Sequence, residues 1–318
     1  MIDLSITRLL INPVLDRARK DYNVWINSDD HIMTSEELIE RSFESDALLI
    51  CHSELMSSKV VAQLSDRVKI IANYSVGVDH CDLEALKSRG VVVTNTPDVL
   101  SDATAEIAIL LLLASSRRAF EGDQMLRKGT WEQWAPIKMN GIQMTGKKLG
   151  IVGMGRVGQV VAKRARGFDM EIHYSNRSRL PKELERGAVY HDSLESLFSE
   201  VDMLSLNCPA TAESKDMINR ESIQWMRPGM VLVNTARGSL VDEDALIDAL
   251  QSEWVAAAGL DVFKTEPGGN SKFADLPNVF MLPHLGSSTR ETRKAMGDRA
   301  LENLDAFFAG EAPKDRLV

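Results

Sequence analysis

Arg237, Glu266 and His284 each come shortly after a run of apolar residues in the last third of the chain. If these runs are parallel strands, the three side chains meet at the edge of a sheet where α/β proteins bind ligands. A histidine changes charge near neutral pH and can pass a proton, and a neighbouring carboxylate favours its charged form. A guanidinium can hold a carboxylate and polarise a carbonyl group. The set therefore suits reversible reduction of a 2-oxo acid, with His284 as proton donor.

Each of these residues also has a plainer explanation when taken alone. The chain has five other histidines in no such setting, and a lone histidine is more often structural. Asp261, which lies between two of the candidates, can orient a nicotinamide amide or cap a turn, and both roles stay open. No group of His, Asp and Glu residues has metal-ligand spacing, so we expect no metal.

A glycine motif precedes this set. Gly153, Gly155 and Gly158 form G-x-G-x-x-G after the apolar run Leu149–Val152 and at the start of a helical pattern, Arg156–Gly167. In that context the first glycine permits a tight turn, the second lets a pyrophosphate approach the backbone, and the third lets helix pack on strand. The start of the helix offers free N–H groups and a partial positive charge to the anion. The motif predicts a dinucleotide site.

The residues about 20 positions after the glycines indicate which dinucleotide binds. NAD sites carry Asp or Glu there to hold the ribose 2′-hydroxyl. This chain has Ser175, Asn176 and Arg177, with Arg179 as a second cation and no carboxylate. Because guanidinium groups pair well with phosphate, we expect NADPH to be preferred, with NADH as the second option.

Strands and helices must position these motifs. Short β-branched runs alternate with helical patterns along nearly the whole chain, and this alternation predicts parallel sheets covered by helices. In the first hundred residues we expect strands at Ile6–Ile11, Asn23–Ile26, Ala47–Cys51, Lys69–Asn73 and Val91–Asn95. Later strands are expected at Leu149–Val152, Glu171–Tyr174, Met203–Leu206, Met230–Asn234, Ala256–Leu260 and Val279–Met281. Thr34 and Glu37 have the spacing of a capping box, which predicts a helix start.

Two long helical patterns join the two series of strands. Ser101–Phe120 is apolar on most of its circumference, so we expect it to be buried, and Ser288–Phe308 returns the chain to the first series. Gly122–Thr145, with two tryptophans, is expected to form an irregular arm. The fold class is α/β with two Rossmann-like, doubly wound domains. The predicted domains are a substrate domain, residues 1–98 and 288–318, and an inserted dinucleotide-binding domain, residues 99–287.

Composition narrows the class of protein. The chain has 318 residues, 44% hydrophobic and 26% charged, which is typical of a globular protein of two domains. A net charge of −9 argues against non-specific binding to nucleic acid or to anionic membranes. Cys51, Cys81 and Cys208 are odd in number and far apart, which fits a reducing compartment. With no signal-peptide pattern and no long apolar run, we expect a cytoplasmic protein.

The motifs occur in the order found in D-2-hydroxyacid dehydrogenases, and the chain resembles that family over nearly its whole length. The matching segments are Gly153–Gly158, NTARG at Asn234–Gly238, GLDVFKTEP at Gly259–Pro267, and PHLG at Pro283–Gly286. The resemblance implies that the family's catalytic Arg, Glu and His fall on Arg237, Glu266 and His284.

The resemblance also implies further binding residues. The family's substrate-carboxylate loop, which binds through backbone N–H groups, falls on Ser75–Asp79, with Val76 and Gly77 joining Arg237 and His284 as substrate contacts. Asn207 stands where the family often has His, which concerns the adenosine side of the cofactor. The cofactor-binding candidates are Thr104, Gly153, Gly155, Arg156, Val157, Gly158, Ser175, Asn176, Arg177, Arg179, Cys208, Pro209, Thr235, Ala236, Asp261 and Gly286.

Within the family, Ser175–Arg177 and the arm segment Trp131–Trp134 make the chain most similar to glyoxylate/hydroxypyruvate reductases. The resemblance then implies an NADPH-dependent homodimer that converts glyoxylate or hydroxypyruvate to glycolate or D-glycerate. Trp131 or Trp134 would lie at the dimer seam or a substrate pocket, or both would pack on their own subunit. Two alternatives stay open: an enzyme for a larger 2-oxo acid, and a dinucleotide-sensing protein like the family's corepressors.

Overall fold

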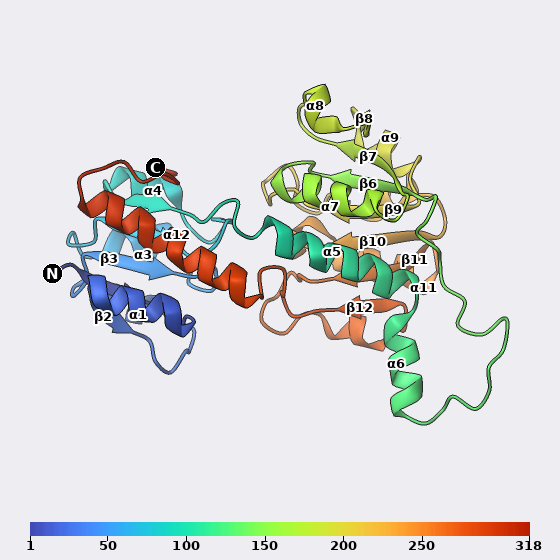
Figure 1. The fold of residues 1–318 in the computed structure, drawn as a ribbon, viewed down its shortest axis with the longest axis horizontal. Coiled ribbons are helices and arrows are strands. Elements are labelled where there is room, and N and C mark those ends of the chain that lie inside the picture. The colour runs from blue at the N-terminus through green and yellow to red at the C-terminus, as the bar shows by residue number, and fades with distance from the viewer. The chain divides into compact units, whose positions relative to one another are not determined.

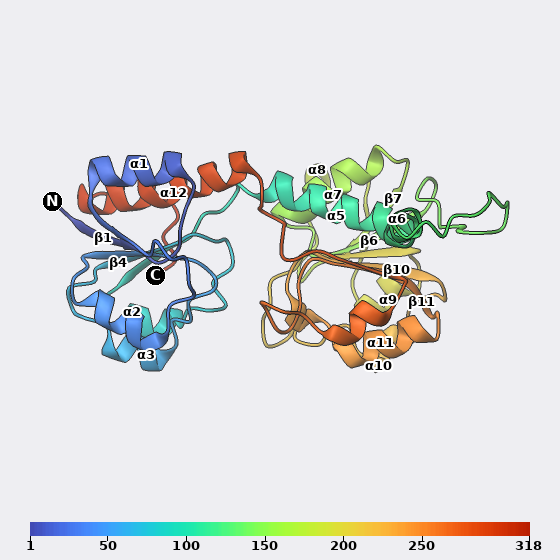
Figure 2. The same cartoon turned by 90° about the horizontal axis from the view of Figure 1, so that it is seen from below.

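The computed structural model describes all residues from 1 to 318 and divides them into two compact units. The first unit consists of residues 1–100 and 288–318, and the second, residues 101–287, is inserted into it. In each unit, helices cover both faces of a parallel sheet (Figure 1 and Figure 2). The prediction of an α/β protein with two doubly wound parallel sheets is confirmed.

The first unit has five parallel strands in the order β2-β1-β3-β4-β5. Its strands are β1 (Asp3–Ile6), β2 (Asn23–Ile26), β3 (Ala47–Ile50), β4 (Ile70–Asn73) and β5 (Val92–Thr94). Its helices are α1 (Asn12–Asp21), α2 (Ser35–Ser42), α3 (Ser58–Gln63), α4 (Leu83–Ser88) and α12 (Arg290–Phe308). Figure 2 shows α1 and α12 on one face and α2 and α3 on the other. Each face has its own apolar cluster.

The second unit has seven parallel strands in the order β12-β11-β10-β9-β6-β7-β8. Its strands are β6 (Lys148–Val152), β7 (Glu171–Ser175), β8 (Val189–His191), β9 (Met203–Leu206), β10 (Met230–Asn234), β11 (Val255–Leu260) and β12 (Val279–Met281). Its α-helices are α5 (Ser101–Ser116), α6 (Ala119–Arg127), α7 (Arg156–Arg166), α8 (Lys182–Glu185), α9 (Leu194–Phe198), α10 (Arg220–Gln224) and α11 (Glu243–Gln251). Two 3₁₀ turns, η1 (Gly238–Leu240) and η2 (Ser271–Asp275), complete it.

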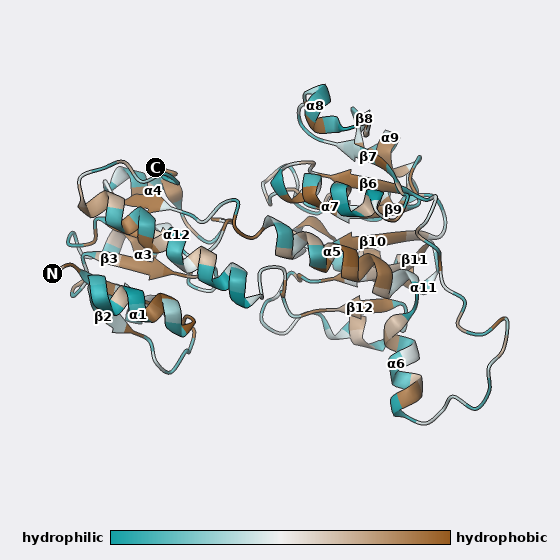
Figure 3. Cartoon of the chain, in the orientation of Figure 1, coloured by the Kyte–Doolittle hydropathy of each residue, from teal (hydrophilic) through white to brown (hydrophobic).

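Burial explains the composition of the central elements. Figure 3 shows hydrophobic residues concentrated in the strands and along much of α5. Helix α5 lies directly on β11: a Cβ atom added to Gly259 would come within 2.8 Å of the Leu111 Cβ and the Ser115 Oγ.

The capping box at the start of α2 is also confirmed. The Thr34 side chain accepts from the Glu37 N–H, and the Glu37 carboxylate accepts from the Thr34 N–H.

Several predicted boundaries were wrong. The first strand is Asp3–Ile6 rather than Ile6–Ile11, because the apolar residues after Ile6 form a loop into α1, whose first turn contains Pro13. The predicted helix Ser101–Phe120 ends at Ser116, since Arg118 adopts a left-handed conformation with φ of 55°. The chain then continues as α6, so the arm begins helical rather than irregular.

The short edge strand β8 was not predicted, because three residues are too few to show a periodic pattern. The last helix begins at Arg290, two residues later than expected, where the Thr289 side chain caps it. None of the helices combines the length and the apolar character that crossing a bilayer requires.

Candidate active site

The carboxyl edge of the seven-stranded sheet carries the residues predicted to do chemistry. Strands β10, β11 and β12 are parallel neighbours, so the condition for their loops to share an edge is met. Arg237 follows β10, Glu266 lies in the loop after β11, and His284 follows β12. All three belong to the second unit.

His284 and Glu266 form a direct pair. The His284 Nδ1 lies 2.6 Å from the Glu266 Oε2, and the side chains are 31% and 26% exposed. The other carboxylate oxygen of Glu266 accepts the Phe263 N–H at 2.7 Å, which fixes the carboxylate. Since a carboxylate only accepts hydrogen bonds, Nδ1 carries a proton, and Nε2 is the nitrogen that can act on a substrate.

The turn that carries His284 is held by Asp261. The His284 N–H donates to the backbone oxygen of Asp261 at 2.9 Å. The Asp261 carboxylate accepts the N–H groups of Leu285 at 2.7 Å and Gly286 at 2.8 Å. The Thr104 hydroxyl donates to the Gly286 carbonyl at 3.1 Å. These bonds hold His284 at a φ of 55°, which is uncommon outside glycine.

Asp261 therefore caps a turn, one of the two roles considered for it, and a contact with nicotinamide stays a prediction. Its side chain is fully buried. Burial raises the pKa of its carboxyl group to about 6, and the N–H groups of Leu285 and Gly286 oppose that rise. A charged form near neutral pH thus depends on these two backbone donors.

The loop that carries Arg237 is organised by Asn234, a residue that the sequence reasoning missed. Asn234 is buried at the end of β10; its Nδ2 donates to the Arg237 carbonyl at 2.8 Å, and its Oδ1 accepts the Ala236 N–H at 3.0 Å. A Cβ atom on Gly238 would lie 1.9 Å from the carbonyl carbon of Phe263, so only glycine allows this close approach. The sequence did contain one signal for this role, an asparagine directly after an apolar run.

The glycine motif has the predicted geometry. Gly153 has a φ of +93°, and a Cβ atom there would meet the Cys208 backbone nitrogen at 2.6 Å. A Cβ atom on Gly158 would lie 2.3 Å from the Gly153 carbonyl oxygen, so the helix packs closely on the turn. Nothing lies within 4 Å of the same position on Gly155, which leaves space for a ligand beside the start of α7.

Two unpaired polar atoms lie at the ends of neighbouring strands on the same edge. The Asn207 Oδ1 follows β9 and the Thr235 Oγ1 follows β10, and both are buried without a hydrogen-bond partner. Buried polar atoms usually have a hydrogen-bond partner, so these two atoms are available to a ligand that binds at this edge. Together with the open glycine turn, these residues fit a dinucleotide.

The segment expected to choose between NADPH and NADH lies at the end of β7. Ser175 is the last residue of the strand and is buried, and Arg177 is exposed. The Asn176 Oδ1 accepts the Met154 N–H at 2.7 Å, which ties this segment to the glycine turn.

Arg179 has a partner of its own. Its guanidinium binds the Glu185 carboxylate at 2.7 Å and 3.2 Å and lies over the Tyr190 ring. The same carboxylate accepts the Tyr174 hydroxyl at 2.8 Å. Arg177 is therefore the better placed of the two arginines to meet a phosphate.

The other candidates occupy varied positions. Arg156 and Val157 begin α7, and Pro209 follows Cys208 after β9. Burial raises the pKa of the Cys208 thiol to about 11, so this cysteine is not a reactive thiolate. In the first unit, Val76 and Gly77 lie in the loop after β4, and neither N–H group has an acceptor in the chain.

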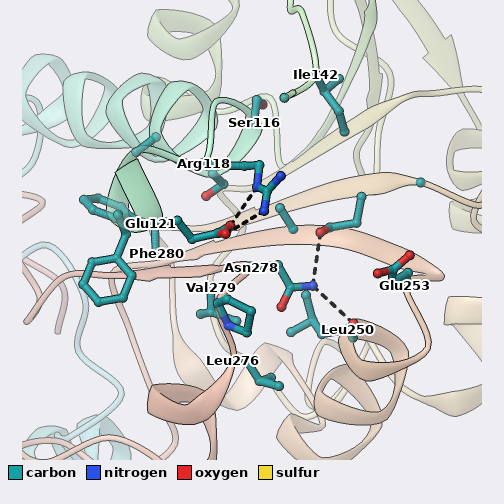
Figure 4. A pocket seen from close by; sticks show the side chains of 18 of the residues that line it. Ser116, Arg118, Glu121, Ile142, Leu250, Glu253, Leu276, Asn278, Val279 and Phe280 are labelled. Atoms are coloured by element: carbon teal, nitrogen blue, oxygen red, sulfur yellow. Dashed lines mark hydrogen bonds and ion pairs between the residues drawn. The ribbon is translucent and has the colours of Figure 1, made fainter. Parts of the chain in front are cut away.

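A cavity of about 670 Å³ lies at the opposite, amino-terminal edge of the seven-stranded sheet (Figure 4). It is bounded by the end of α5, the start of α6 and the segments before β10 and β12. The Arg118–Glu121 ion pair lies on one side, and Asn278, whose Nδ2 donates to the Leu250 and Ala256 carbonyls, lies on another (Figure 4). No predicted catalytic or cofactor residue lines it.

Known proteins identify the family. Residues 109–286 match the D-isomer specific 2-hydroxyacid dehydrogenase, NAD binding domain, which is more than half of the chain. A glycerate dehydrogenase from Hyphomicrobium methylovorum is 43% identical over 309 residues, 96% of each chain. The chain belongs to the D-isomer specific 2-hydroxyacid dehydrogenase family. It is thus an NAD-binding oxidoreductase.

Two further members of this dehydrogenase family are similar along nearly their whole length. A glyoxylate reductase from Thermococcus onnurineus (strain NA1) is 42% identical over 313 residues, covering 97% of this chain and 93% of the relative. An NADPH-dependent glyoxylate/hydroxypyruvate reductase from Sinorhizobium meliloti, solved with NADP and malonate, has a TM-score of 0.90 and 30% identity. That match covers 100% of this chain and 97% of the solved one.

Proposed function

We propose that this dehydrogenase is an NADPH-dependent reductase of small 2-oxo acids, with glyoxylate and hydroxypyruvate as its foremost substrates. The observation that carries the proposal is the 2.6 Å pair of His284 and Glu266, on the same sheet edge as Arg237 and the glycine turn. The names of similar proteins, glyoxylate reductase and glycerate dehydrogenase, support this substrate class. The products are glycolate and D-glycerate.

In the proposed mechanism His284 is the proton donor. Glu266 holds Nδ1 and so orients the ring, and the Nε2–H of the protonated imidazole is given to the carbonyl oxygen of the substrate as that oxygen gains electrons. When bound, the dinucleotide supplies the hydride that reduces the carbonyl carbon. After the step His284 is neutral and still held by Glu266, and it regains a proton from solvent.

Arg237 and the first unit would bind the substrate. The Arg237 guanidinium holds the carboxylate and polarises the neighbouring carbonyl, which stabilises the developing negative charge. The N–H groups of Val76 and Gly77 provide a second, uncharged contact for the carboxylate. We therefore assign the loop of Val76 and Gly77, in the unit of residues 1–100 and 288–318, to substrate binding together with Arg237 and His284, and we assign dinucleotide binding to the unit of residues 101–287.

The preference for NADPH rests on the end of β7. The segment Ser175–Arg177 has hydroxyl, amide and guanidinium donors and no carboxylate to repel a 2′-phosphate. Arg177 and Arg179 are both exposed, but the Arg179 guanidinium is paired with Glu185, so Arg177 is the cation that we assign to the 2′-phosphate. The NADP-bound Sinorhizobium meliloti reductase supports this choice.

We also propose a homodimer that uses the arm after α5. Trp131 and Trp134 are 57% and 77% exposed, and Leu126 and Ile137 are exposed as well. Large apolar side chains gathered on one segment are typical of protein interaction surfaces. The three cysteines are unpaired, which supports a cytoplasmic location.

One assay tests the proposed function. The purified chain is given glyoxylate, hydroxypyruvate, pyruvate and a branched longer 2-oxo acid, each with NADPH and with NADH, and oxidation of the cofactor is followed by absorbance. We expect the highest kcat/KM with glyoxylate or hydroxypyruvate and NADPH. A higher value with the longer acids would favour the alternative of an enzyme for larger substrates, and no turnover with any acid would overturn the proposal.

A further inference from the structure

Two asparagine side chains donate hydrogen bonds to carbonyl groups of the loop Ser75–Gly77, which follows β4. The Asn73 Nδ2 donates to the Gly77 carbonyl at 2.9 Å and to the Ser75 carbonyl at 3.4 Å, and the Ser75 carbonyl also accepts the Thr96 N–H at 3.1 Å. The Asn95 Nδ2 donates to the Val76 carbonyl at 3.0 Å. Both asparagines are buried, at the ends of the neighbouring strands β4 and β5. Three successive carbonyl groups are therefore fixed by the body of the first unit.

Because these carbonyl groups are fixed, the directions of the Val76 and Gly77 N–H groups are fixed as well. In a planar trans peptide the C=O of one residue and the N–H of the next point in opposite directions. Holding the Ser75 carbonyl therefore aims the Val76 N–H away from the asparagines, and holding the Val76 carbonyl does the same for Gly77. These two N–H groups have no acceptor in the chain, so they form a pair of outward donors suited to an anion.

The two asparagines are themselves held in orientation. The Asn73 Oδ1 lies 3.1 Å from the His80 Nε2, which leaves the Asn73 amide nitrogen for the loop. The Asn95 backbone is fixed on both sides: its N–H donates to the Asp315 carbonyl at 3.3 Å, and its carbonyl accepts the Asn303 Nδ2 at 3.3 Å. Asn303 in turn binds the Asp315 carboxylate at 3.0 Å. The Asn95 backbone is therefore held by contacts within the first unit itself.

We propose that Asn73 and Asn95 are positioning residues that aim the Val76 and Gly77 N–H groups at the substrate carboxylate. This proposal rests on the proposed function, and it assigns specificity for 2-oxo acids over plain aldehydes partly to two side chains that never touch the substrate. Their effect acts on the carboxylate and leaves the dinucleotide site, which is in the other unit, unchanged.

The test uses two substitutions at one position. Asn95→Asp keeps the shape but places a second acceptor against the Val76 carbonyl, and Asn95→Ala removes the donor without adding charge. We expect KM for glyoxylate to rise about tenfold in both, the usual effect of a lost buried hydrogen bond. The kcat and the KM for NADPH should change less than about twofold, because these substitutions do not reach the groups that bind the dinucleotide or move the proton. Asn12→Asp, at an exposed position in the same unit, is the control for added charge.

A second measurement separates positioning from general damage to the structure. Oxamate carries the carboxylate of a 2-oxo acid but cannot be reduced, so its dissociation constant with NADPH present reports carboxylate binding alone. We expect it to weaken by the same factor as KM for glyoxylate, with Tm showing that the variants are folded. Folded variants that keep wild-type oxamate binding would overturn the positioning proposal alone. A wild-type chain that reduces no 2-oxo acid would instead overturn the proposed function.

Discussion

The backbones of Gly238 and Phe263 are in direct contact, so close that a side chain on Gly238 would overlap the Phe263 carbonyl group. This contact joins the loop that carries Arg237 to the loop that carries Glu266. Because Glu266 also binds His284, the three candidate catalytic residues are linked by short contacts within one unit. Their relative placement is therefore a property of the second unit alone.

His284 is expected to be the proton donor of the reaction. His284→Ala should lower kcat about 1000-fold, since general acid catalysis contributes factors of this order. The KM for NADPH should change little, because His284 acts on the proton rather than on the dinucleotide. Steady-state kinetics at pH 7 measure both. The exposed His31→Ala is the control, and a His284 variant that keeps more than a tenth of kcat would contradict the assignment.

Arg237 is expected to act both in binding and in the reaction. Arg237→Ala should raise KM for glyoxylate and also lower kcat, because the guanidinium is used in the ground state and in the transition state. Arg237→Lys should recover part of kcat but not KM, since an ammonium group keeps the charge and loses the paired geometry. If only KM changed in the alanine variant, the role in polarising the carbonyl would be wrong.

The cofactor preference can be reversed at the end of β7. In the double variant Ser175→Asp with Arg177→Ala, the ratio of kcat/KM for NADPH to that for NADH should fall about 100-fold, because a charge-assisted contact is lost and a repulsive carboxylate is added. Arg179→Ala is the matched control: its guanidinium is bound to Glu185, so it should lower Tm with a smaller effect on the ratio. A double variant with an unchanged ratio would refute the 2′-phosphate contact.

Asp261 gives a prediction for the dependence of stability on pH. Its pKa is about 6 in the folded protein and 3.8 in the unfolded chain, so the folded state binds the proton more tightly between these values. The contribution of Asp261 to the free energy of unfolding is therefore fully present below about pH 4 and is lost as the pH rises through 6. The loss is at most about 3 kcal/mol, at roughly 1.4 kcal/mol per pKa unit.

The comparison of wild type with Asp261→Asn measures this effect by thermal unfolding from pH 4 to 8. The difference in Tm, variant minus wild type, should rise with pH and level off above about pH 7, because the variant cannot ionise at this position. The exposed Asp275→Asn should show no such rise from this cause. A difference that stays constant over the whole range would contradict the raised pKa.

The arm supplies a prediction about assembly. Trp134→Ala should weaken the proposed dimer or raise KM for the substrate, because we expect a second copy or the substrate to cover its large exposed apolar surface. Sedimentation at several concentrations and steady-state kinetics measure the two effects. Phe43→Ala, exposed in the first unit, is the control. Unchanged assembly together with unchanged Michaelis constants would show that Trp134 does neither.

The sequence predicted those parts of the structure in which local chemistry and periodicity agree. The glycine turn follows its strand as expected, and the strands before Arg237 and His284 were predicted with the bounds that the structure shows. The left-handed break at Arg118 was missed because the apolar pattern of α5 runs past it.

Other features of the candidate site depend on contacts between distant residues. Arg179 was expected to meet phosphate, yet Glu185 holds it, and no spacing rule indicates that pairing. The positions of Asn73 and Asn234 are likewise meaningful only once the loops above them are folded.

The insertion of one unit into the other determines the order in which the two units are completely synthesised. Helix α12 contributes Met296, Leu301 and Leu304 to the apolar cluster against β1 and β4. These side chains are synthesised only after residues 101–287 have emerged, so the inserted unit has all of its residues available first. The core of the unit that contains residues 1–100 therefore cannot be complete until the inserted unit has been synthesised, which differs from domains that are completed in N-terminal-first order.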